Sequence, residues 1–531
     1  MPLITFPFGD SPGIARDIEP YRLPAGIWSD GRNMLFKERR AVKAFGWETF
    51  ISSLTIAARG LFFCPLNSEA LWIYPGLADV RAFDIEGTTA EITRVSGDYT
   101  GGEFNKWTFA YLHGLGILNN GADTPQLWSP PSLATKLVDL TNWPASTTAR
   151  TVRSFLNFLI ALDVTKSGTR HAAMVKWSHL ADAGAVPSSW DETDATKQAG
   201  ENVLSETPGA CIDCLPLGSS NIIYKEDSVY GMNFVGGRFI FAFQRLILPF
   251  GALTQDCVAL VERQHFVATN DDIVLHDGIN AKSLVNEKDR NFIFDNLTTI
   301  GKENSFVVPY SSRKEVWFCF PGLGETVPSL AMIWNRERDS IAFRDLPRAR
   351  AIAYAPAMRI TATADTWDGD AATTWASETA QTWNDISFVG FENRVLMLDE
   401  VNSQVAELKD DVFDADGTAE RSYLERQSMP FGNTDDKGNA LVDLRLVKFV
   451  QEIWPHITGT SGVIISVYVG TQMEFEEAID WLDPINFIIG TTNFIPVYKS
   501  CRFLSIRFEA TGSDQWELHG FTYSLEPMGK F

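Results

Sequence analysis

Two cysteines three positions apart have the spacing in this chain that most suggests chemistry. Cys211 and Cys214 form a Cys-x-x-Cys pair, which can hold a zinc ion or cycle between dithiol and disulfide. A structural zinc site needs a second such pair, or two histidines at matching spacing, and the sequence has neither. The other four cysteines, at positions 64, 257, 319 and 501, lie mostly in apolar runs. We therefore interpret all six cysteines as reduced core residues.

Acidic residues close to glycines form a second group of candidates. The segments 414–417 (DADG) and 368–370 (DGD) resemble parts of calcium loops, but neither has the glutamate that closes such a loop. We interpret both as acidic turns. Asp277 and Asp399 each end a predicted strand, a position from which two carboxylates could meet at a central channel of the fold. No motif supports that role, and a fold alone does not give a function.

Motifs of the common enzyme classes are missing from the sequence. There is no Walker-type phosphate loop, no Gly-x-Ser-x-Gly elbow and no His-Glu-x-x-His pair. Histidines occur singly, mostly beside apolar or aromatic residues, as is typical of structural histidines; they are 113, 171, 179, 265, 276, 456 and 519. We predict no catalytic residue, no cofactor and no metal, and hence a protein that is not an enzyme.

The composition indicates a folded, acidic protein. The 531 residues include 45 Lys and Arg against 67 Asp and Glu, a formal charge of −22. With 45% hydrophobic and 12% aromatic residues, the chain can bury a large core, which excludes disorder, collagen and coiled coil. Because such a negative surface repels phosphate backbones, we do not expect high-affinity DNA binding. DNA that only slides through a passage is compatible with this charge. No signal-peptide pattern and no long apolar run occurs, so we expect neither export nor stable membrane insertion.

One pattern recurs from about residue 60 to about residue 430: a strand, a tight turn and a second strand. Its copies begin at residues 71, 107, 155, 221, 265, 316 and 388. Most of the spacings are close to the length of a propeller blade, a four-stranded unit of about 40 to 50 residues. We therefore predict a mostly β protein with a β-propeller of five to seven blades at 61–430. A pair of β-sandwiches with the same strand rhythm is the alternative.

Two polar segments interrupt the repeats. Residues 178–212 are predicted to form an extended loop with little core of its own. Residues 361–385 carry Trp367, Trp375 and Trp383 at an eight-residue period. Short turns that stack these side chains are the favoured interpretation, and an exposed aromatic contact surface is the other.

The two flanks differ from the repeats. Residues 1–60 hold eight Lys and Arg against six Asp and Glu, so this predicted N-terminal arm is locally basic in an acidic chain. It contains five candidate interface residues for an acidic partner surface, with a solvated turn as the alternative: Arg32, Lys37, Arg39, Arg40 and Lys43. Residues 440–531 alternate between apolar and polar and predict a β-sandwich module, which we place at 431–531. We expect the arm and this module to form a β-rich platform.

Several stretches resemble the tail nozzle (tail tubular) proteins of short-tailed bacteriophages. The opening segment 17–36 (DIEPYRLPAGIWSDGRNMLF), closed by 43–47 (KAFGW), is similar to the start of such proteins. Two segments are similar to their middle: 221–232 (NIIYKEDSVYGM) and 265–278 (HFVATNDDIVLHDG). The segment 313–318 (RKEVWF) recurs in such proteins as well. The Trp-Thr repeat of 361–385 also occurs in them. The resemblance covers most of the chain in patches.

This resemblance implies a structural virion protein of a phage tail. Such a protein is a propeller on a β-platform that assembles as a homohexameric tube below the portal and its adaptor. Genomic double-stranded DNA passes through the lumen during ejection without specific binding. The expected partners are therefore further copies of the chain, the tail adaptor and a tail fibre or tailspike. The expected location is the virion, after synthesis in the host cytoplasm.

Two other functions compete with the conduit. A propeller with exposed tryptophans could bind or cleave host surface polysaccharide as a tail component, because sugar rings stack on aromatic side chains. A monomeric cytoplasmic scaffold is the third possibility, and it predicts no ring. Saturable sugar binding would favour the polysaccharide hypothesis, and a six-fold ring would favour the conduit.

Overall fold

The structure, a computed structural model, describes residues 3–8, 12–24, 26–65, 70–237, 239–285, 288–295, 297–359, 390–434 and 440–530. Within these residues the protein is almost entirely β-structure. The short helices are α1 (Arg290–Phe294), α2 (Thr299–Asn304) and the 3-10 turns η1 (Pro20–Arg22) and η2 (Ser311–Arg313). The predicted aromatic segment 361–385 lies outside the described residues.

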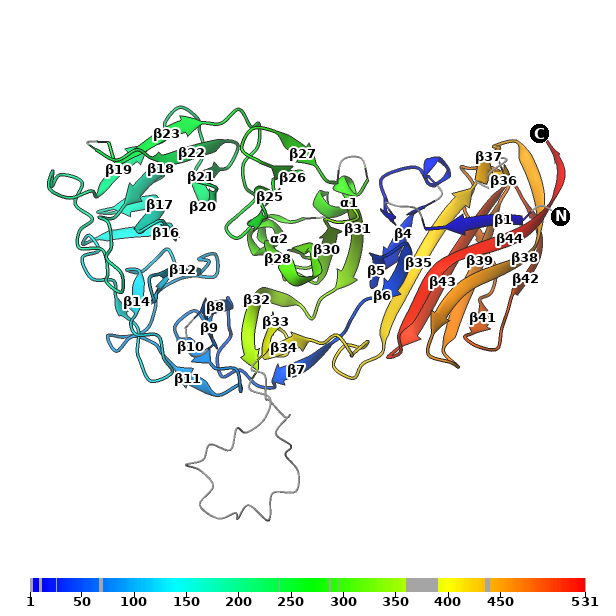
Figure 1. Ribbon diagram of the computed structural model, residues 1–531, viewed down its shortest axis with the longest axis horizontal. Coiled ribbons are helices and arrows are strands. Elements are labelled where there is room, and N and C mark those ends of the chain that lie inside the picture. Colours follow the sequence, from blue (N-terminus) through cyan, green and yellow to red (C-terminus); the bar gives the residue numbers. More distant parts are fainter. Residues whose placement is uncertain are drawn as a thin grey trace, which may run out of the picture.

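Seven four-stranded antiparallel sheets follow one another around a ring, so the predicted β-propeller is confirmed, with seven blades (Figure 1). The strands, blade by blade, are β8 (Phe62–Pro65), β9 (Ala70–Pro75), β10 (Val80–Phe83) and β11 (Thr89–Glu91); β12 (Thr108–Leu112), β13 (Leu115–Asn119), β14 (Gln126–Trp128) and β15 (Val138–Asp139); β16 (Thr147–Phe155), β17 (Phe158–Lys166), β18 (Thr169–Trp177) and β19 (Gly200–Val203); β20 (Cys211–Leu217), β21 (Ser220–Lys225), β22 (Val229–Phe234) and β23 (Phe241–Arg245); β24 (Val258–Val261), β25 (Gln264–Ala268), β26 (Ile273–His276) and β27 (Ala281–Ser283); β28 (Phe306–Tyr310), β29 (Glu315–Phe320), β30 (Leu330–Asn335) and β31 (Ser340–Asp345); and β32 (Ala349–Arg359), β33 (Gly390–Asp399), β34 (Gln404–Leu408) and β7 (Trp47–Ile51). Middle strands such as β29 (EVWFCF) are buried throughout, because the blades on either side cover both of their faces.

The ring is closed by a strand from the N-terminal flank. In the last blade β7 pairs with β34, with Trp47 opposite Leu408 and Ile51 opposite Val405. The first strand of this blade, β32, in turn contacts β8 of the first blade. Hydrogen bonds between strands distant in sequence therefore hold the ring together and cover a sheet edge that would otherwise be open.

Both ends of the chain build a second module, a β-sandwich of two six-stranded sheets. One sheet has the order β42-β38-β44-β6-β5 with β1 also on β44, and the other has the order β4-β35-β43-β39-β40 with β41 also on β39. The strands are β1 (Leu3–Pro7), β4 (Asp30–Arg32), β5 (Met34–Lys37), β6 (Arg40–Lys43), β35 (Glu420–Met429), β38 (Leu446–Gly459), β39 (Ile464–Gln472), β40 (Asp480–Trp481), β41 (Ile485–Ile488), β42 (Ile495–Cys501), β43 (Phe503–Gly512) and β44 (Trp516–Lys530). The shorter strands of the flanks are β2 (Gly13–Ile14), β3 (Ile27–Trp28), β36 (Phe431–Thr434) and β37 (Ala440–Val442). Aromatic rings from both ends meet in the core: the Phe6 ring centre lies 5.0 Å from that of Phe521, and that of Trp28 lies 6.3 Å from that of Phe508.

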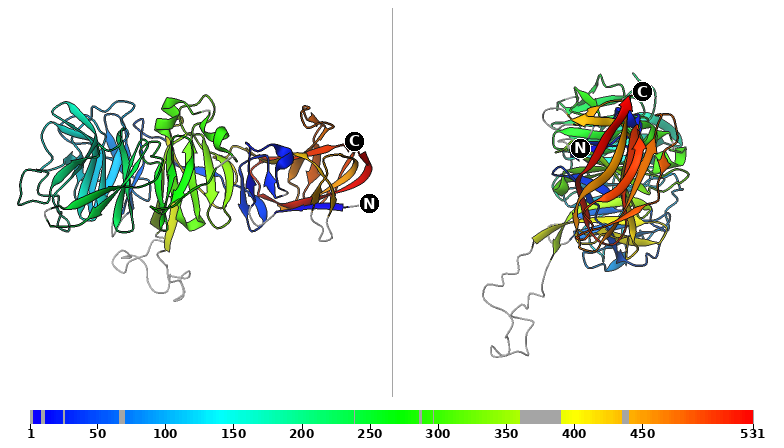
Figure 2. Two further views of the ribbon diagram at one scale, coloured as in Figure 1. Left: turned by 90° about the horizontal axis from the view of Figure 1, so that it is seen from above. Right: turned by 90° about the vertical axis from the view of Figure 1, so that its right-hand side faces the viewer.

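A buried junction fixes the sandwich to blade 6. The fully buried side-chain amide of Asn33 donates to Asp345 Oδ2 and to the Arg421 carbonyl, each at 2.8 Å, and its oxygen accepts from the Asp345 N–H. Arg344 of β31, also fully buried, donates to the Phe45 carbonyl at 2.8 Å. A single hydrophobic cluster continues from the sandwich through the last three blades. The two modules therefore form one body, which extends in the plane of the propeller disc (Figure 2).

The predicted boundaries need four corrections. Residues 1–60 do not form a single arm, because β1, β4, β5 and β6 belong to the sandwich while β7 belongs to the propeller. The sandwich begins earlier than residue 431, since β35 is one of its central strands. The segment 178–212 is not merely a loop: it supplies β19 to blade 3, and its Trp190 is fully buried against Trp143. The two strands predicted within 388–399 are one, β33, among the described residues from 390 onward.

The junction makes a prediction about stability. Asn33→Ala should lower the free energy of unfolding by about 3 kcal/mol, because a buried N–H and a buried carbonyl lose their partners. Asn142→Ala is the matched control. Asn142 has the same left-handed backbone conformation (φ 64° against 56° for Asn33), but it is exposed and makes one side-chain hydrogen bond, to the Pro187 carbonyl. Urea unfolding of both variants measures the difference, and equal losses would contradict this account of the junction.

Candidate functional site

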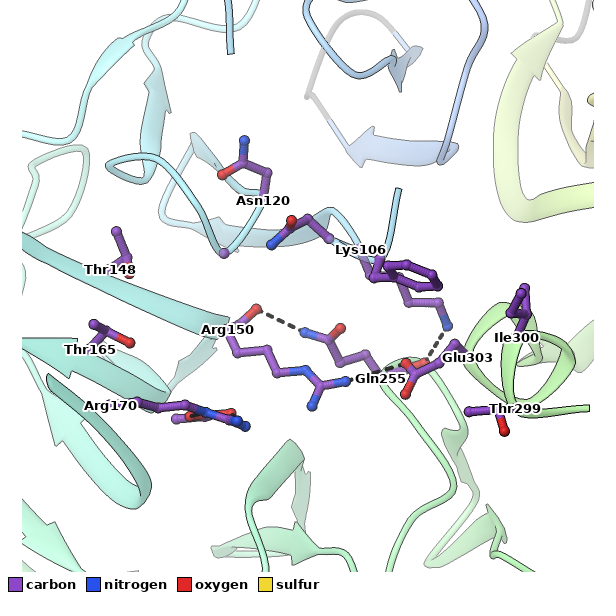
Figure 3. Close-up of a pocket in the computed structure, with 14 residues that line it drawn as sticks. Lys106, Asn120, Thr148, Arg150, Thr165, Arg170, Gln255, Thr299, Ile300 and Glu303 are labelled. Carbon is purple, nitrogen blue, oxygen red and sulfur yellow. Dashed lines mark hydrogen bonds and ion pairs between the residues drawn. The ribbon is translucent and has the colours of Figure 1, made fainter. Parts of the chain in front are cut away.

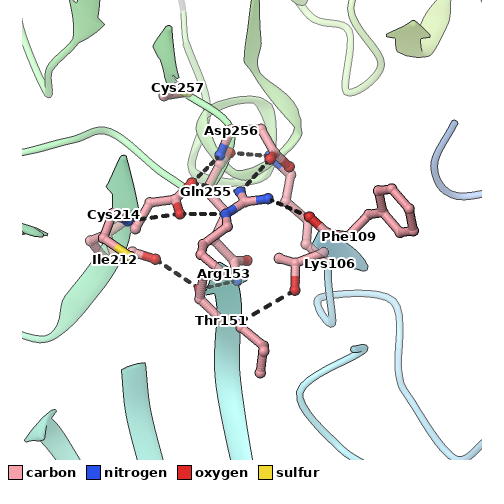
Figure 4. A network of polar contacts seen from close by, with 12 residues as sticks. Lys106, Phe109, Thr151, Arg153, Ile212, Cys214, Gln255, Asp256 and Cys257 are labelled. Carbon is pink, nitrogen blue, oxygen red and sulfur yellow. Dashed lines mark hydrogen bonds and ion pairs between the residues drawn. The ribbon is translucent and has the colours of Figure 1, made fainter. Parts of the chain in front are cut away.

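An ionic network occupies the centre of the propeller (Figure 4). Arg153, on the innermost strand of blade 3, donates to both carboxylate oxygens of Asp213, at 2.8 and 2.7 Å, and to Asp256 at 2.6 Å. Asp213 lies on the innermost strand of blade 4, and Asp256 lies directly before that of blade 5. The Asp256 N–H donates in turn to Asp213 at 3.0 Å. One guanidinium thus ties three successive blades together.

A lysine next to blade 2 also reaches across the centre. Lys106 precedes the first strand of blade 2, and its ammonium donates to the carbonyls of Gln255 (2.9 Å) and Ser305 (3.0 Å), in front of blades 5 and 6. The Gln255 side chain donates to the Arg150 carbonyl at 2.8 Å and to Thr151 Oγ1 at 2.6 Å. Blades 2 and 5 are not neighbours in the ring, so these contacts bridge the central channel.

Burial and charge pairing act in opposite directions in this network. Burial alone would raise the pKa of Asp213, but the Arg153 guanidinium lowers it below its usual value. Burial likewise works against the charge of Arg153, yet the two carboxylates hold its pKa well above the usual value. Burial lowers the pKa of Lys106. The network is therefore charged but closely paired, and its side chains cross the channel.

A polar cavity of about 450 Å³ opens at one mouth of the bridged channel (Figure 3). Its walls come from blades 2, 3 and 5 and from α2; the lining residues are Phe104, Asn105, Lys106, Asn120, Gly121, Thr148, Arg150, Asp163, Thr165, Arg170, Gln255, Thr299, Ile300 and Glu303. Arg150 and Glu303 form an ion pair in its wall, with 3.3 Å between Nη2 and Oε2. Cavities of this size are within the usual range for small-molecule sites.

Two of the scattered histidines meet at a tyrosine. The Tyr224 hydroxyl lies 2.7 Å from His265 Nδ1 and 2.6 Å from His276 Nε2, and all three side chains are buried. His265 Nε2 donates to the Pro216 carbonyl, and His276 Nδ1 accepts from the Gly278 N–H. In each ring, therefore, one nitrogen is a donor and the other an acceptor, as in a neutral imidazole. Burial lowers the pKa of both histidines to about 4, so both are neutral. Every hydrogen-bonding atom of the two rings is used within the fold, as expected of structural histidines.

The other residues singled out for chemistry have structural roles. Cys211 and Cys214 are buried and unbonded, and burial raises the pKa of each thiol to about 12, as expected for reduced core cysteines. Asp277 and Asp399 do not reach the channel; each accepts hydrogen bonds from backbone N–H groups of the following turn. Asp414 likewise closes an acidic turn by accepting from the Gly417 N–H. No group of His, Cys, Asp and Glu side chains suited to hold a metal ion occurs among the described residues.

The five candidate interface residues of the arm divide into two groups. Lys43 is not available to a partner, because it is 1% exposed and its ammonium donates to the Gly512 carbonyl inside the sandwich. Arg32 is committed to the junction through Asp345, at 3.4 Å. Lys37, Arg39 and Arg40 lie on the β5–β6 hairpin, where Arg39 occupies an exposed two-residue turn. The three remaining candidates, Trp367, Trp375 and Trp383, lie outside the described residues.

Comparisons with known proteins add little to the fold. No family model and no curated protein matches the chain. Among solved structures it is similar to the WD40 β-propeller domain of Doa1 (11% identity, TM-score 0.37, 69% of this chain and 97% of that one). It is also similar to the WD40 domain of Toxoplasma gondii coronin (7% identity, TM-score 0.36, 71% of this chain and 87% of that one). A third similar structure is AztD of Citrobacter koseri (11% identity, TM-score 0.31, 52% of this chain and 70% of that one). Likenesses this distant carry no weight for function, and the strand pairing itself defines the propeller. No helix in the described part of the chain is both long and apolar enough to cross a bilayer.

The histidine pair could have been found from the sequence, whereas the ionic network could not. His265 and His276 lie in two predicted strands joined by a tight turn, and antiparallel pairing of that hairpin places them directly opposite each other. The register of the predicted hairpin was therefore enough to show that the two histidines are neighbours. Arg153, Asp213 and Asp256 lie on three different blades, and no spacing in the sequence relates them.

The channel network predicts a large effect of removing its guanidinium. Arg153→Met should cost about 3–5 kcal/mol of unfolding free energy, because it leaves the Asp213 carboxylate, 6% exposed, without its counter-charge. Arg290→Met is the matched control: it removes the exposed pair with Asp271 and should cost less than about 1 kcal/mol. Chemical denaturation measures both variants. A loss for Arg153→Met no larger than for Arg290→Met would mean that the network does not stabilise the ring.

The neutral histidine pair predicts a dependence of stability on pH. Each histidine titrates at about 6.5 in the unfolded chain and at about 4 in the folded one, so the unfolded state binds more protons between these values. Acidification from about pH 6.5 should therefore remove up to about 1.4 kcal/mol per pH unit for each histidine. Burial raises the pKa of Asp289 and Glu420 to about 7, and these two carboxyls titrate in the opposite sense.

The histidine contribution is therefore measured as a difference between two proteins. The wild-type chain should lose more stability between about pH 6.5 and pH 5 than the His265→Gln/His276→Gln variant, whatever their absolute stabilities. Parallel pH profiles of the unfolding free energy would show that the pair is not held neutral.

Proposed function

We propose that this chain is a structural subunit of a phage tail nozzle, a ring whose lumen conducts double-stranded DNA during genome ejection. The proposal begins from the sequence resemblance to nozzle proteins of short-tailed phages. In it the chain acts by its shape and by its contacts with other copies, and no catalytic step is required. The virion is then its location and the host cytoplasm its place of synthesis.

The observation that carries the proposal is the sandwich built from both ends of the chain. β1 pairs with β44 and β4 pairs with β35, so the flanks form one module beside the propeller. A β-module beside the propeller is what the resemblance to nozzle proteins implies, so this module supports the proposal. The buried junction of Asn33 and Arg344 holds it rigidly on blade 6. A rigid two-part body supports a role in a tube that must withstand pressure from the packaged genome.

The bridged propeller channel supports a lumen that lies between copies. Lys106 joins blade 2 to blades 5 and 6 across the channel, and Arg153 ties blades 3, 4 and 5 together. In this proposal DNA therefore passes outside each propeller, along the axis of a ring of subunits. A formal charge of −22 also favours free transit, because acidic walls repel phosphates and do not retain them. A homohexamer is the ring that the nozzle resemblance implies.

The far end of the sandwich supports contacts with other tail components. β1, β37 and the C-terminal end of β44 lie at the end of the molecule away from the propeller (Figure 1). Leu3, Val442 and Met528 on these strands are 56%, 59% and 64% exposed. Exposed apolar side chains gathered at one end favour protein contacts there. The adaptor, neighbouring copies and a tail fibre or tailspike are the partners that we propose for the surfaces of this body.

Assembly tests the proposal directly. Light scattering and negative-stain imaging of the purified chain, alone and with a phage adaptor–portal complex, should show a closed six-fold ring with a central hole between subunits. The hole should lie outside each seven-bladed disc. A chain that stays monomeric and does not bind the adaptor would contradict the proposal.

The basic hairpin offers a variant for the same assay. If Arg39 at the tip of the β5–β6 hairpin meets an acidic partner surface, Arg39→Glu should weaken ring formation or adaptor binding about tenfold, most clearly at low salt. Arg245→Glu is the matched control, because Arg245 is equally exposed but lies on the outer strand of blade 4, away from the sandwich. Equal effects of the two variants would exclude the hairpin as the contact.

A further inference from the structure

We propose that the polar cavity at the mouth of the propeller channel binds an acidic saccharide, one or two sugar units of which at least one carries a carboxylate. The site belongs to a single chain and uses blades 2, 3 and 5 with α2, so it does not depend on ring assembly (Figure 3). Saccharide recognition here is a binding activity in addition to the proposed conduit role.

The wall of blade 3 presents an ordered row of polar side chains. Thr148 on β16 pairs with Thr165 on β17, and Thr165 pairs with Arg170 on β18, so the three lie side by side across the sheet. Arg170 is held in place by a bidentate contact to the buried Asp163, at 2.8 and 2.6 Å. The row is therefore fixed before any ligand arrives, which lowers the entropic cost of binding.

Several hydrogen-bonding groups in the cavity have no partner in the described part of the chain. The hydroxyls of Thr148, Thr165 and Thr299 make no side-chain hydrogen bond there, and the Asn105 side chain uses only its oxygen, which accepts from the Gly102 N–H. Each of these hydroxyls can both donate and accept, as a sugar hydroxyl can. The Arg150–Glu303 pair adds fixed donors and acceptors on the facing wall. This inventory matches a ligand rich in hydroxyl groups.

The apolar part of the cavity is small and lies at its rim. Of the fourteen lining residues, Phe104 and Ile300 are the large apolar ones, and they are 67% and 41% exposed. A peptide that binds through apolar side chains would find little surface to bury. An exposed phenylalanine ring next to polar walls instead suits the apolar face of a sugar ring, which stacks on aromatic side chains.

The charges that line the cavity favour an acidic sugar. Lys106, Arg150 and Arg170 face two carboxylates, Asp163 and Glu303. The cavity thus carries an excess of positive charge within a chain whose formal charge is −22. Asp163 is paired with Arg170 and Glu303 with Arg150. The Lys106 ammonium is bound to two neutral carbonyls, and among the described residues no carboxylate is in direct contact with it, although Asp256 and Glu303 lie near enough to favour its charge. A ligand carboxylate close to Lys106 would provide the missing counter-charge.

The test uses the full-length chain and four probes: galacturonate, galactose, acetate and a short acidic peptide. Calorimetry and saturation-transfer NMR should show saturable galacturonate binding with a Kd of about 0.1–1 mM, at least several-fold tighter than galactose. Phe104→Ala and Thr165→Val should each weaken it about three- to tenfold. Phe239→Ala, which removes an equally exposed ring from blade 4, should leave it unchanged.

Each other outcome overturns the proposal. Absence of saturable binding to either sugar rules out a saccharide site. Acetate binding as tight as galacturonate binding would reduce the cavity to an anion site, and tighter binding of the peptide would assign it to a protein partner. If Phe104→Ala and Thr165→Val leave galacturonate binding intact, the sugar binds at another site. Unchanged thermal unfolding of the two variants establishes that they are folded.

Discussion

Closure of the propeller ring is the constraint on which the rest of this structure depends. A ring of sheets is stable only if its last blade is sealed to its first, and this chain seals it by pairing β7 from the N-terminal flank with β34 from the end of the repeats. The chain on either side of that seal must therefore leave the propeller at the same place. Both flanks leave the propeller at this last blade and fold together into the sandwich, which contacts β31 of blade 6.

The centre of the ring is stabilised by polar contacts as well as by apolar packing. Arg153, Asp213 and Asp256 exchange short hydrogen bonds between three blades, and Lys106 reaches from blade 2 to blades 5 and 6. Because charges removed from water are costly unless they are paired, these groups allow few arrangements of the inner strands. The same contacts divide the channel and leave a defined cavity at one mouth.

The elements that the sequence predicted best were those with a strong local pattern. The strand pairs at 71–84 and 316–335 fall on β9, β10, β29 and β30, since apolar alternation and tight turns are properties of neighbouring residues. Sequence patterns did not place β7 in the last blade or Lys43 in the interior, because both depend on partners hundreds of residues away. The candidate cavity was also not predictable, as its lining residues come from blades that only the closed ring brings together.

The pairing of β7 with β34 also affects how the chain folds during its synthesis. The residues of β7 are made early, but their partner at 404–408 is made only after six complete blades, and β1 must wait still longer for β44. Until then the first strands have unpaired edges that are exposed to other chains. Contacts this distant in sequence slow folding and favour aggregation of the nascent protein. The protein can therefore reach its native state only near the end of translation. Chaperones that keep the early strands from pairing with other chains would improve its yield.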